Sequence, residues 1–368
     1  MRPRLVLALA GTVVALVIAA AVKYQRVTMQ TPGAEPNHYS SPTNSPTLTS
    51  ANTVAHDLAC TGATVAVADI ARGLSLYKYG SWRRPLSTVK PPTALGYWRV
   101  VIQGHFAYAP THRGFDIIDI SQPASASIVG EYLAEGGQTT EENSRSLGGL
   151  HERLDVSGAY AYLTDDLNNL HIVDIHDPAQ PTRVGVLGFG NTSHLTAVAA
   201  GPDRLVYVGV YGISGHRGVQ VVDVSTPSQP SPVSFTVMGG EPGLALNDGM
   251  LFVVSSYLDP WRQVLEIFRA GPTLTKVSEL VLHESSCRIV KICGKQALIA
   301  YSKTPEGEFA FSDHGYSGVE LLDIADPARP KRLATFSTPG LAQAAINVNR
   351  SILVAGGVAG LLVKRRWW

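Results

Sequence analysis

A short pattern of hydrophobic and polar positions recurs along the chain and determines the fold that we expect. It consists of two aliphatic residues, an aspartate, a further aliphatic residue and a turn that contains proline. Four stretches carry the pattern: Phe115–Pro123, Leu170–Pro178, Val219–Pro227 and Val319–Pro327. Their aspartates, Asp119, Asp174, Asp223 and Asp323, are 55, 49 and 100 residues apart, so the last interval leaves room for one more copy.

Three weaker copies complete the series. Gln263–Pro272 lies midway in the long interval, with Phe268 in place of the aspartate, and Gly73–Tyr79 and Gly360–Arg366 flank the set. Each copy follows two other short apolar stretches that are separated by turn signals such as Asn247-Asp248-Gly249, and most copies precede a fourth stretch. One unit is therefore four short antiparallel strands in about 40–55 residues, the size of a propeller blade.

The repeats predict an all-β fold, a seven-bladed β-propeller of four-stranded antiparallel blades, preceded by an N-terminal hydrophobic helix. The propeller is expected over residues 55–368. Because the last blade ends after its third strand, we expect Thr47–Thr53 to supply the fourth strand and close the ring.

The aliphatic-aliphatic-Asp-aliphatic turn with its DPxxP tail, as in Ile172–Pro181 and Leu321–Pro330, resembles the LVIVD repeat family. That family comprises bacterial and archaeal surface or secreted β-propeller proteins. The resemblance implies the fold, and because the family shares no catalytic motif it implies no activity. The repeated aspartate itself is expected to accept hydrogen bonds from the amides of its own turn, with metal binding as the alternative.

The N-terminus predicts export. Arg2 and Arg4 precede an uncharged run of 18 residues, Leu5–Val22, which as a helix would span roughly 27 Å, close to the ~30 Å hydrocarbon core. Residues 1–27 are therefore a signal anchor or a cleaved signal peptide, and residues 28–54 are a linker rich in Pro, Ser and Thr. We expect the propeller to be anchored in the cytoplasmic membrane and held outside the cytoplasm, or to be secreted or periplasmic if the signal is cleaved.

Composition narrows the partners. Only 16% of the residues are charged and the net charge is +1, so we expect no nucleic-acid binding through bulk positive charge. The low charge and the 45% hydrophobic content fit many short buried strands.

Longer connections gather on one face. In a propeller, the connection into each innermost strand and the connection between the second and third strands lie at the same end, which we call the mouth face. The insertions Leu133–Leu150, Tyr211–Arg217, Tyr257–Arg262 and Ser302–Ser317 all belong to it. Since function tends to lie on elaborated loops over a rigid scaffold, we expect the binding site there, over blades three to six.

Candidate site residues follow from aligning the innermost strands on their turns. His151 and His194 fall at equivalent positions of adjacent blades in this alignment, which makes them candidates for metal ligands or acid–base groups. The seven ligand-binding candidates at the channel mouth are His56, Trp98, His151, Glu152, His194, Arg288 and Gln343. The other histidines, including His171, are expected to be mostly solvated.

These features favour a non-enzymatic binding or scaffold module at the cell surface or in the periplasm. Its partner would be a protein or a glycan on the mouth face, the membrane would be contacted through the N-terminal segment, and no cofactor is expected. The alternative is a propeller hydrolase or lyase that acts on a carbohydrate or small ligand at the channel mouth. The fold alone does not decide between them.

Overall fold

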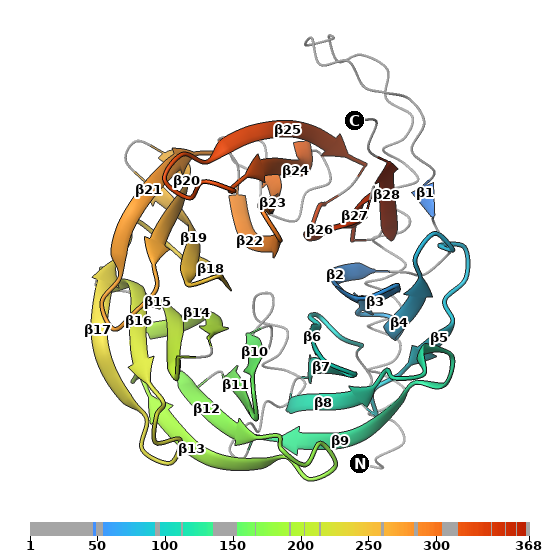
Figure 1. Ribbon diagram of the computed structural model, residues 1–368, viewed down its shortest axis with the longest axis horizontal. Coiled ribbons are helices and arrows are strands. Elements are labelled where there is room, and N and C mark those ends of the chain that lie inside the picture. Colours follow the sequence, from blue (N-terminus) through green and yellow to red (C-terminus); the bar gives the residue numbers. More distant parts are fainter. Residues whose placement is uncertain are drawn as a thin grey trace, which may run out of the picture.

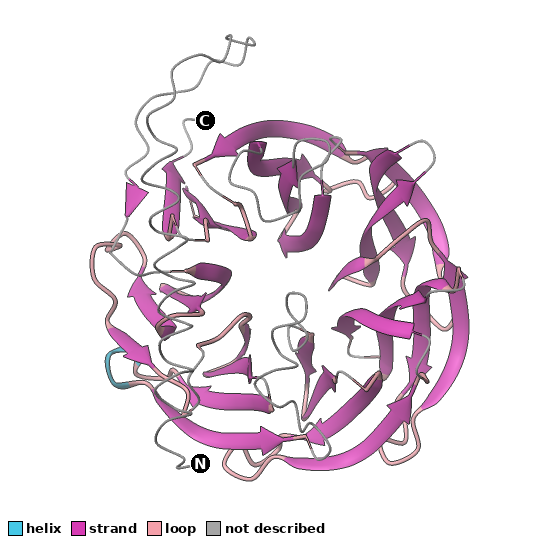
Figure 2. Cartoon of the chain, turned by 180° about the vertical axis from the view of Figure 1, so that it is seen from behind, coloured by secondary structure: helices cyan, strands magenta, loops and turns pink. Residues whose placement is uncertain are grey.

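The computed structural model describes residues 47–48, 54–92, 96–111, 113–134, 153–165, 167–190, 193–201, 203–212, 215–258, 261–282, 286–303, 316–339, 341–349, 351–357 and 359–365. These residues form seven antiparallel four-stranded sheets, so the expected seven-bladed β-propeller is confirmed. Figure 1 shows the seven sheets arranged around a central axis, and Figure 2 shows that strands dominate the described chain.

The strands of each blade are given from the channel outward. Blade one is β2 (Ala55–Thr61), β3 (Thr64–Asp69), β4 (Gly73–Lys78) and β5 (Ser87–Val89). Blade two is β6 (Val101–Gln103), β7 (Phe106–Thr111), β8 (Gly114–Asp119) and β9 (Ser127–Leu133), with the 3-10 helix η1 (Pro123–Ser125). Blade three is β10 (Leu154–Ser157), β11 (Tyr160–Thr164), β12 (Asn169–Asp174) and β13 (Thr182–Gly188). Blade four is β14 (Ser193–Ala200), β15 (Leu205–Gly212), β16 (Arg217–Asp223) and β17 (Ser231–Val237). Blade five is β18 (Gly243–Asn247), β19 (Met250–Leu258), β20 (Trp261–Arg269) and β21 (Thr275–Val281). Blade six is β22 (Ser286–Cys293), β23 (Gln296–Lys303), β24 (Tyr316–Asp323) and β25 (Lys331–Thr338).

Blade seven joins the two ends of the chain. It contains β26 (Ala344–Val348), β27 (Ser351–Ala355) and β28 (Leu361–Arg365), and its outer strand is β1 (Thr47–Leu48). Thr47 pairs with Leu362 and Leu48 with Leu361, so the expected closing strand is confirmed for these two residues. The N-terminal hydrophobic segment lies outside the described residues. Within the described ranges, no helix has the length and apolarity needed to cross a bilayer.

The closing strand supplies a direct test of the ring. Proline cannot donate a hydrogen bond to a strand ladder, so the double substitution Thr47→Pro and Leu48→Pro is expected to lower the melting temperature by about 2–5 °C. A control carrying Gly33→Pro and Ala34→Pro, near the start of the linker, is expected to melt like the wild type. Thermal denaturation followed by circular dichroism measures both, and equal melting temperatures for all three proteins would contradict closure by β1.

The hydrophobic cores lie between blades. Each of seven buried clusters draws residues from two neighbouring blades, for example Leu58 of blade one with Leu353 of blade seven, and Leu251 of blade five with Val219 of blade four. Burial of these aliphatic faces is the main stabilising term, because a lone four-stranded blade has no other way to cover both its faces.

The recurring aspartate organises a turn, as the sequence predicted. Its Oδ1 accepts a hydrogen bond from the backbone N–H two residues later. The Ser121 and His176 amides donate to Asp119 and Asp174 at 2.8 Å. The Ser225 amide donates to Asp223 at 2.7 Å and the Ala325 amide to Asp323 at 2.9 Å.

The proline of each turn docks on the preceding blade. The Ser87, Ser234 and Ser278 hydroxyls donate to the carbonyls of Pro123, Pro272 and Pro327 at 2.5–2.6 Å. At the matching positions of blades two and three stand Gly130 and Gly185, where an added Cβ would lie only 2.0 Å from the Pro178 carbonyl oxygen and 1.9 Å from that of Pro227. The repeat motif is therefore a latch between neighbouring blades at five of the blade junctions.

The candidate binding face of the propeller

The hairpins between the second and third strands reach farthest toward the mouth face in blades four to six. Their second and third strands have 7–9 residues, against 5 or 6 in the first three blades. The stretches that the sequence identified as insertions, Tyr211–Arg217 and Tyr257–Arg262, thus extend the strand hairpins themselves. Paired strands hold side chains more rigidly than a loop does, which suits a binding surface.

Two of the predicted mouth residues meet. His56 Nδ1 lies 3.0 Å from the Trp98 carbonyl oxygen, and because a carbonyl only accepts, Nδ1 carries the proton. The His56 and Trp98 rings also form a T-shaped contact with centroids 4.8 Å apart. His56 is therefore committed to a contact between blades one and two.

The other predicted residues are placed less closely together. His194 is exposed on β14, and Gln343 is half-buried before β26, where its backbone N–H donates to the Ala355 carbonyl at 2.8 Å. The backbone of Arg288 lies in β22, while its side chain, like the whole of His151 and Glu152, falls outside the described residues.

Strand register corrects the alignment of blade four. Pairing between the first two strands skips one residue in three blades, between Ala55 and Asp57, between Leu195 and Ala197, and between Cys287 and Ile289. The bulged residues are thus His56, Thr196 and Arg288, so Thr196 and not Leu195 matches His56, and His194 lies one residue farther out than predicted. The cause is the turn between β14 and β15, in which the Gly201 amide donates to the Leu205 carbonyl. This turn is one residue longer than the corresponding turn of blade one, so an alignment on the turns misplaces β14 by one residue. His194 is therefore displaced by one position from its predicted place, whereas His151 lies outside the described residues and its predicted equivalence to His194 stays a prediction.

Two arginine–tyrosine pairs mark the mouth face over blades four and five. Tyr211 pairs across the strands with Arg217, whose guanidinium carbon lies 4.7 Å from the tyrosine ring centroid. Tyr257 pairs likewise with Arg262 at 4.9 Å. Both are cation–π contacts at the tip of the hairpin between the second and third strands.

The two pairs belong to one continuous surface. The Met238 amide donates to the Arg217 carbonyl at 2.8 Å, and the next residue, Gly239, lies directly against the Tyr257 ring. His194 pairs with Tyr211 on the other side, and exposed His216 stacks on Phe235 with centroids 4.1 Å apart and planes 11° apart. We call the following residues the basic–aromatic strip: His194, Tyr211, His216, Arg217, Tyr257 and Arg262.

Sequence reasoning located these hairpins but missed their side chains. The available signal was that each insertion begins with Tyr and ends with Arg in two successive blades. Burial, and then the negative charge of Glu266, raise the pKa of Tyr257. Its phenol therefore stays protonated and donates to Glu266 at 3.1 Å, which fixes the ring under Arg262.

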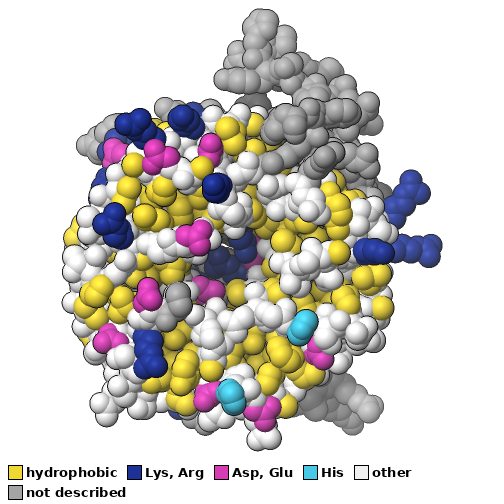
Figure 3. Space-filling model, in the orientation of Figure 1, with side chains coloured by type: hydrophobic (Ala, Val, Ile, Leu, Met, Phe, Trp, Pro, Cys, Tyr) yellow, Lys and Arg dark blue, Asp and Glu magenta, His cyan; other side chains and the backbone are white. Residues whose placement is uncertain are grey.

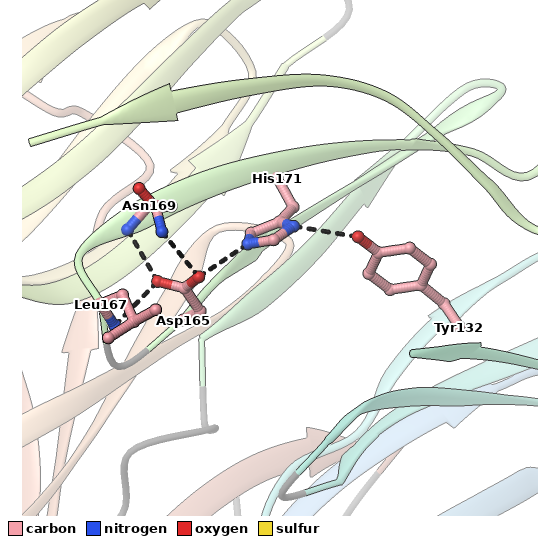
Figure 4. Close-up of polar contacts among 5 residues, drawn as sticks. All are labelled: Tyr132, Asp165, Leu167, Asn169 and His171. Atoms are coloured by element: carbon pink, nitrogen blue, oxygen red, sulfur yellow. Dashed lines mark hydrogen bonds and ion pairs between the residues drawn. The ribbon is translucent and has the colours of Figure 1, made fainter. Parts of the chain in front are cut away.

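A buried polar chain lies between blades two and three (Figure 4). His171 Nε2 is 2.8 Å from Asp165 Oδ2, and His171 Nδ1 is 2.9 Å from the Tyr132 hydroxyl. His171 is only 1% exposed, so the expectation that it is solvated was wrong. With the Asp165 carboxylate accepting from Nε2–H, Nδ1 accepts from the phenol, and every partner in the chain is satisfied. The arrangement resembles a proton relay but serves as a clamp between blades, because both rings are buried.

The clamp makes stability depend on pH. Burial alone would raise the pKa of Asp165, but hydrogen bonds from His171 and Asn169 hold it below its usual value. A carboxyl with a lowered pKa contributes stability above its unfolded pKa of about 4 and loses it as the pH falls through the folded value.

Asp165→Asn is therefore expected to lower the free energy of unfolding at pH 7 by about 1–2 kcal/mol. Its stability is also expected to fall less steeply than that of the wild type below about pH 4. Urea unfolding at pH 7, 5, 4 and 3 measures both effects, and parallel pH profiles for the two proteins would argue against an ionised Asp165 in the folded state.

Charged side chains also meet in the central channel. The Asp57 carboxylate, fully buried, lies 2.9 and 3.1 Å from the Lys291 ammonium through its two oxygens and accepts from the Val100 amide at 3.1 Å. Arg99 Nε is 3.9 Å from the same carboxylate. Figure 3 shows basic and acidic side chains together in the hollow at the centre of one face. The contact ties blade one to blade six across the blade that closes the ring.

Metal ligands do not gather in the part of the chain that the structure describes, where no three His, Cys, Asp or Glu side chains form a group that could hold an ion.

Comparisons with known proteins agree with this architecture. The LVIVD repeat profile matches residues 97–134, 148–187 and 207–236. No curated protein sequence matches the chain. Three of the solved structures that share this fold are described next.

The β-propeller domain of Cps50 (Swd1) from Myceliophteria thermophila is 11% identical, with a TM-score of 0.63, over 88% of this chain and 99% of that one. A chain of a mitotic checkpoint complex is 13% identical, with a TM-score of 0.62, over 92% of this chain and 99% of that one. The computationally designed protein Ika8 is 12% identical, with a TM-score of 0.58, over 87% and 98%. Identities this low establish only the fold, and the three stretches that match the LVIVD repeat lie in blades two to four of this β-propeller.

Proposed function

We propose that this protein is a binding module, exported and held at the outer side of the cytoplasmic membrane by its N-terminal segment, that contacts its partner through the mouth face over blades four and five. The observation that carries the proposal is the basic–aromatic strip, which repeats an arginine–tyrosine pair on two adjacent raised hairpins. Tyrosine and arginine are enriched at the energetic centres of binding surfaces.

The fold supports the same role. A rigid ring with seven interblade cores presents its connections as a fixed surface, and a structurally similar propeller occurs within a mitotic checkpoint complex. A hydrolase or lyase at the channel mouth has less support. His56 is engaged by Trp98, and the other acid–base candidates except His194 lie outside the described residues.

Affinity capture tests the binding role. The full chain is purified in detergent from membranes of its native host, and retained components are identified by mass spectrometry and sugar analysis. A component that is retained by the wild type is expected to be lost from a variant with Arg217→Glu and Arg262→Glu. It should remain with Arg269→Glu, because Arg269 is exposed at the opposite end of β20 from Arg262. Equal retention by all three proteins would contradict the proposal.

Export is tested separately. Residues 1–53 fused to alkaline phosphatase, which is active only outside the cytoplasm, are expected to give active enzyme in the membrane fraction. Activity in the soluble periplasmic or culture fraction would indicate cleavage, and inactive cytoplasmic fusion would overturn the export proposal.

A further inference from the structure

We propose that the basic–aromatic strip binds an acidic polysaccharide, a glycan whose sugars carry carboxylate groups. The inference rests on the proposed function, since it names the chemistry of the partner at the same surface. It follows from the charge of the strip, the geometry of its guanidinium groups, and the repetition of the pair on neighbouring blades.

The strip carries positive charge that its acidic neighbours neutralise only in part. Arg217 and Arg262 contribute two fixed charges, and His194 and His216 are exposed beside Arg217. Glu279, whose charge acts on Arg262, is bound 2.5 Å from the Lys276 ammonium, and Glu266 lies 2.9 Å from the same ammonium. Among these side chains, the three positive charges of Arg217, Arg262 and Lys276 exceed the two negative charges of Glu266 and Glu279 by one, and this excess favours an anionic partner.

The guanidinium groups are held in a geometry that suits a carboxylate. Each packs over a tyrosine ring that is fixed by other contacts, Tyr257 by Gly239 and Glu266, and Tyr211 by its strand neighbours. The Nε atoms of Arg217 and Arg262 are buried and make no hydrogen bond within the described chain, so neither arginine is turned toward an internal carboxylate through Nε. A stacked, oriented guanidinium binds a planar carboxylate through two parallel hydrogen bonds.

Repetition favours a polymer. The two pairs occupy the tips of corresponding hairpins in adjacent blades, so they present similar sites at a fixed spacing, as a chain with a repeating carboxylate requires. Aromatic surface lies beside them, where His216, exposed and stacked on Phe235, offers a ring to the apolar face of a sugar. A protein partner has no need of this repetition, although an acidic protein remains a possible result of the test.

Polygalacturonate is the probe, with dextran as the neutral glycan, polyglutamate as the acidic polypeptide and polyphosphate as the phosphate polymer. Binding to the full chain in detergent is measured by biolayer interferometry at two salt concentrations. The wild type is expected to bind polygalacturonate, more weakly at high salt, and not dextran. The double variant Arg217→Gln and Arg262→Gln is expected to bind at least about tenfold more weakly, whereas Arg269→Gln should match the wild type.

His216→Ala separates a glycan from other polyanions. Loss of sugar stacking is expected to weaken polygalacturonate binding by about threefold or more while leaving the weaker binding of polyglutamate and polyphosphate unchanged. Equal affinity for all three polyanions, or polygalacturonate binding that survives the double arginine substitution, would overturn the proposal. If affinity capture retains a protein through the same arginines and polygalacturonate is not bound, the glycan inference fails while the binding function stands.

Discussion

Gly185→Ala is expected to lower the free energy of unfolding by about 2–3 kcal/mol, because the new methyl group has no space. Its Cβ would stand 1.9 Å from the Pro227 carbonyl oxygen, an atom of the backbone in the turn of the next blade. To accept it, the outer strand of blade three and the turn of blade four must separate, and the latch between them opens. Urea unfolding at pH 7 measures the loss.

Gly271→Ala is the matched control. Gly185 lies in the outer strand of blade three, and Gly271 lies in the turn just before the outer strand of blade five, where an added Cβ would meet nothing closer than the Thr273 carbonyl oxygen at 3.8 Å. Its substitution is expected to change the free energy of unfolding by less than about 1 kcal/mol. If both alanine variants lost equal stability, the close approach at Gly185 would not be the cause, and the latch would lose its support.

Lys291→Met is expected to cost about 3 kcal/mol, since it leaves the Asp57 carboxylate buried without its closest cation. Arg99, with Nε at 3.9 Å, compensates only in part, and the Val100 amide supplies one hydrogen bond. The loss is expected to be larger than for a surface ion pair because the Asp57 carboxylate is fully buried. Urea unfolding at pH 7 gives the value.

The double variant Asp57→Asn and Lys291→Met distinguishes a charge effect from a packing effect. With the buried negative charge removed, it is expected to recover more than half of the stability lost by Lys291→Met alone. A double variant as unstable as the sum of the single variants would show that Asp57 and Lys291 act independently, contrary to their 2.9 Å contact.

The sequence predicted the fold well because the repeat carries two independent signals. Aliphatic residues at strand spacing predict the blades, and the aspartate with its proline predicts a turn whose hydrogen bonds are local, as at Asp119 and Ser121. Seven repeats of known length leave few topologies open. The shortage of strands in the last blade then predicted the closing strand, found at Thr47–Leu48.

The site was less predictable because it depends on register and on contacts between blades. One extra residue in the turn before Leu205 shifted the alignment of His194, and periodicity does not reveal such a shift. His171 is buried because Tyr132, which is 39 residues away in another blade, contacts it, and the pattern of the sequence around His171 does not show this contact. The sequence contains the tyrosine and the arginine of each pair, but it does not show that the two side chains stack. They stack because the hairpins continue as paired strands, which places each arginine opposite its tyrosine.

Photo-cross-linking in intact cells tests the binding face most directly. A photo-reactive amino acid is placed at His194, exposed on the mouth face, or at His176, exposed in the turn of blade three at the opposite face. The full chain is expressed in its native host, and products are compared by gel mobility and composition. The account predicts a discrete adduct from position 194 and none from position 176. An adduct from position 176 alone, or equal adducts from both, would contradict the assignment of binding to the mouth face.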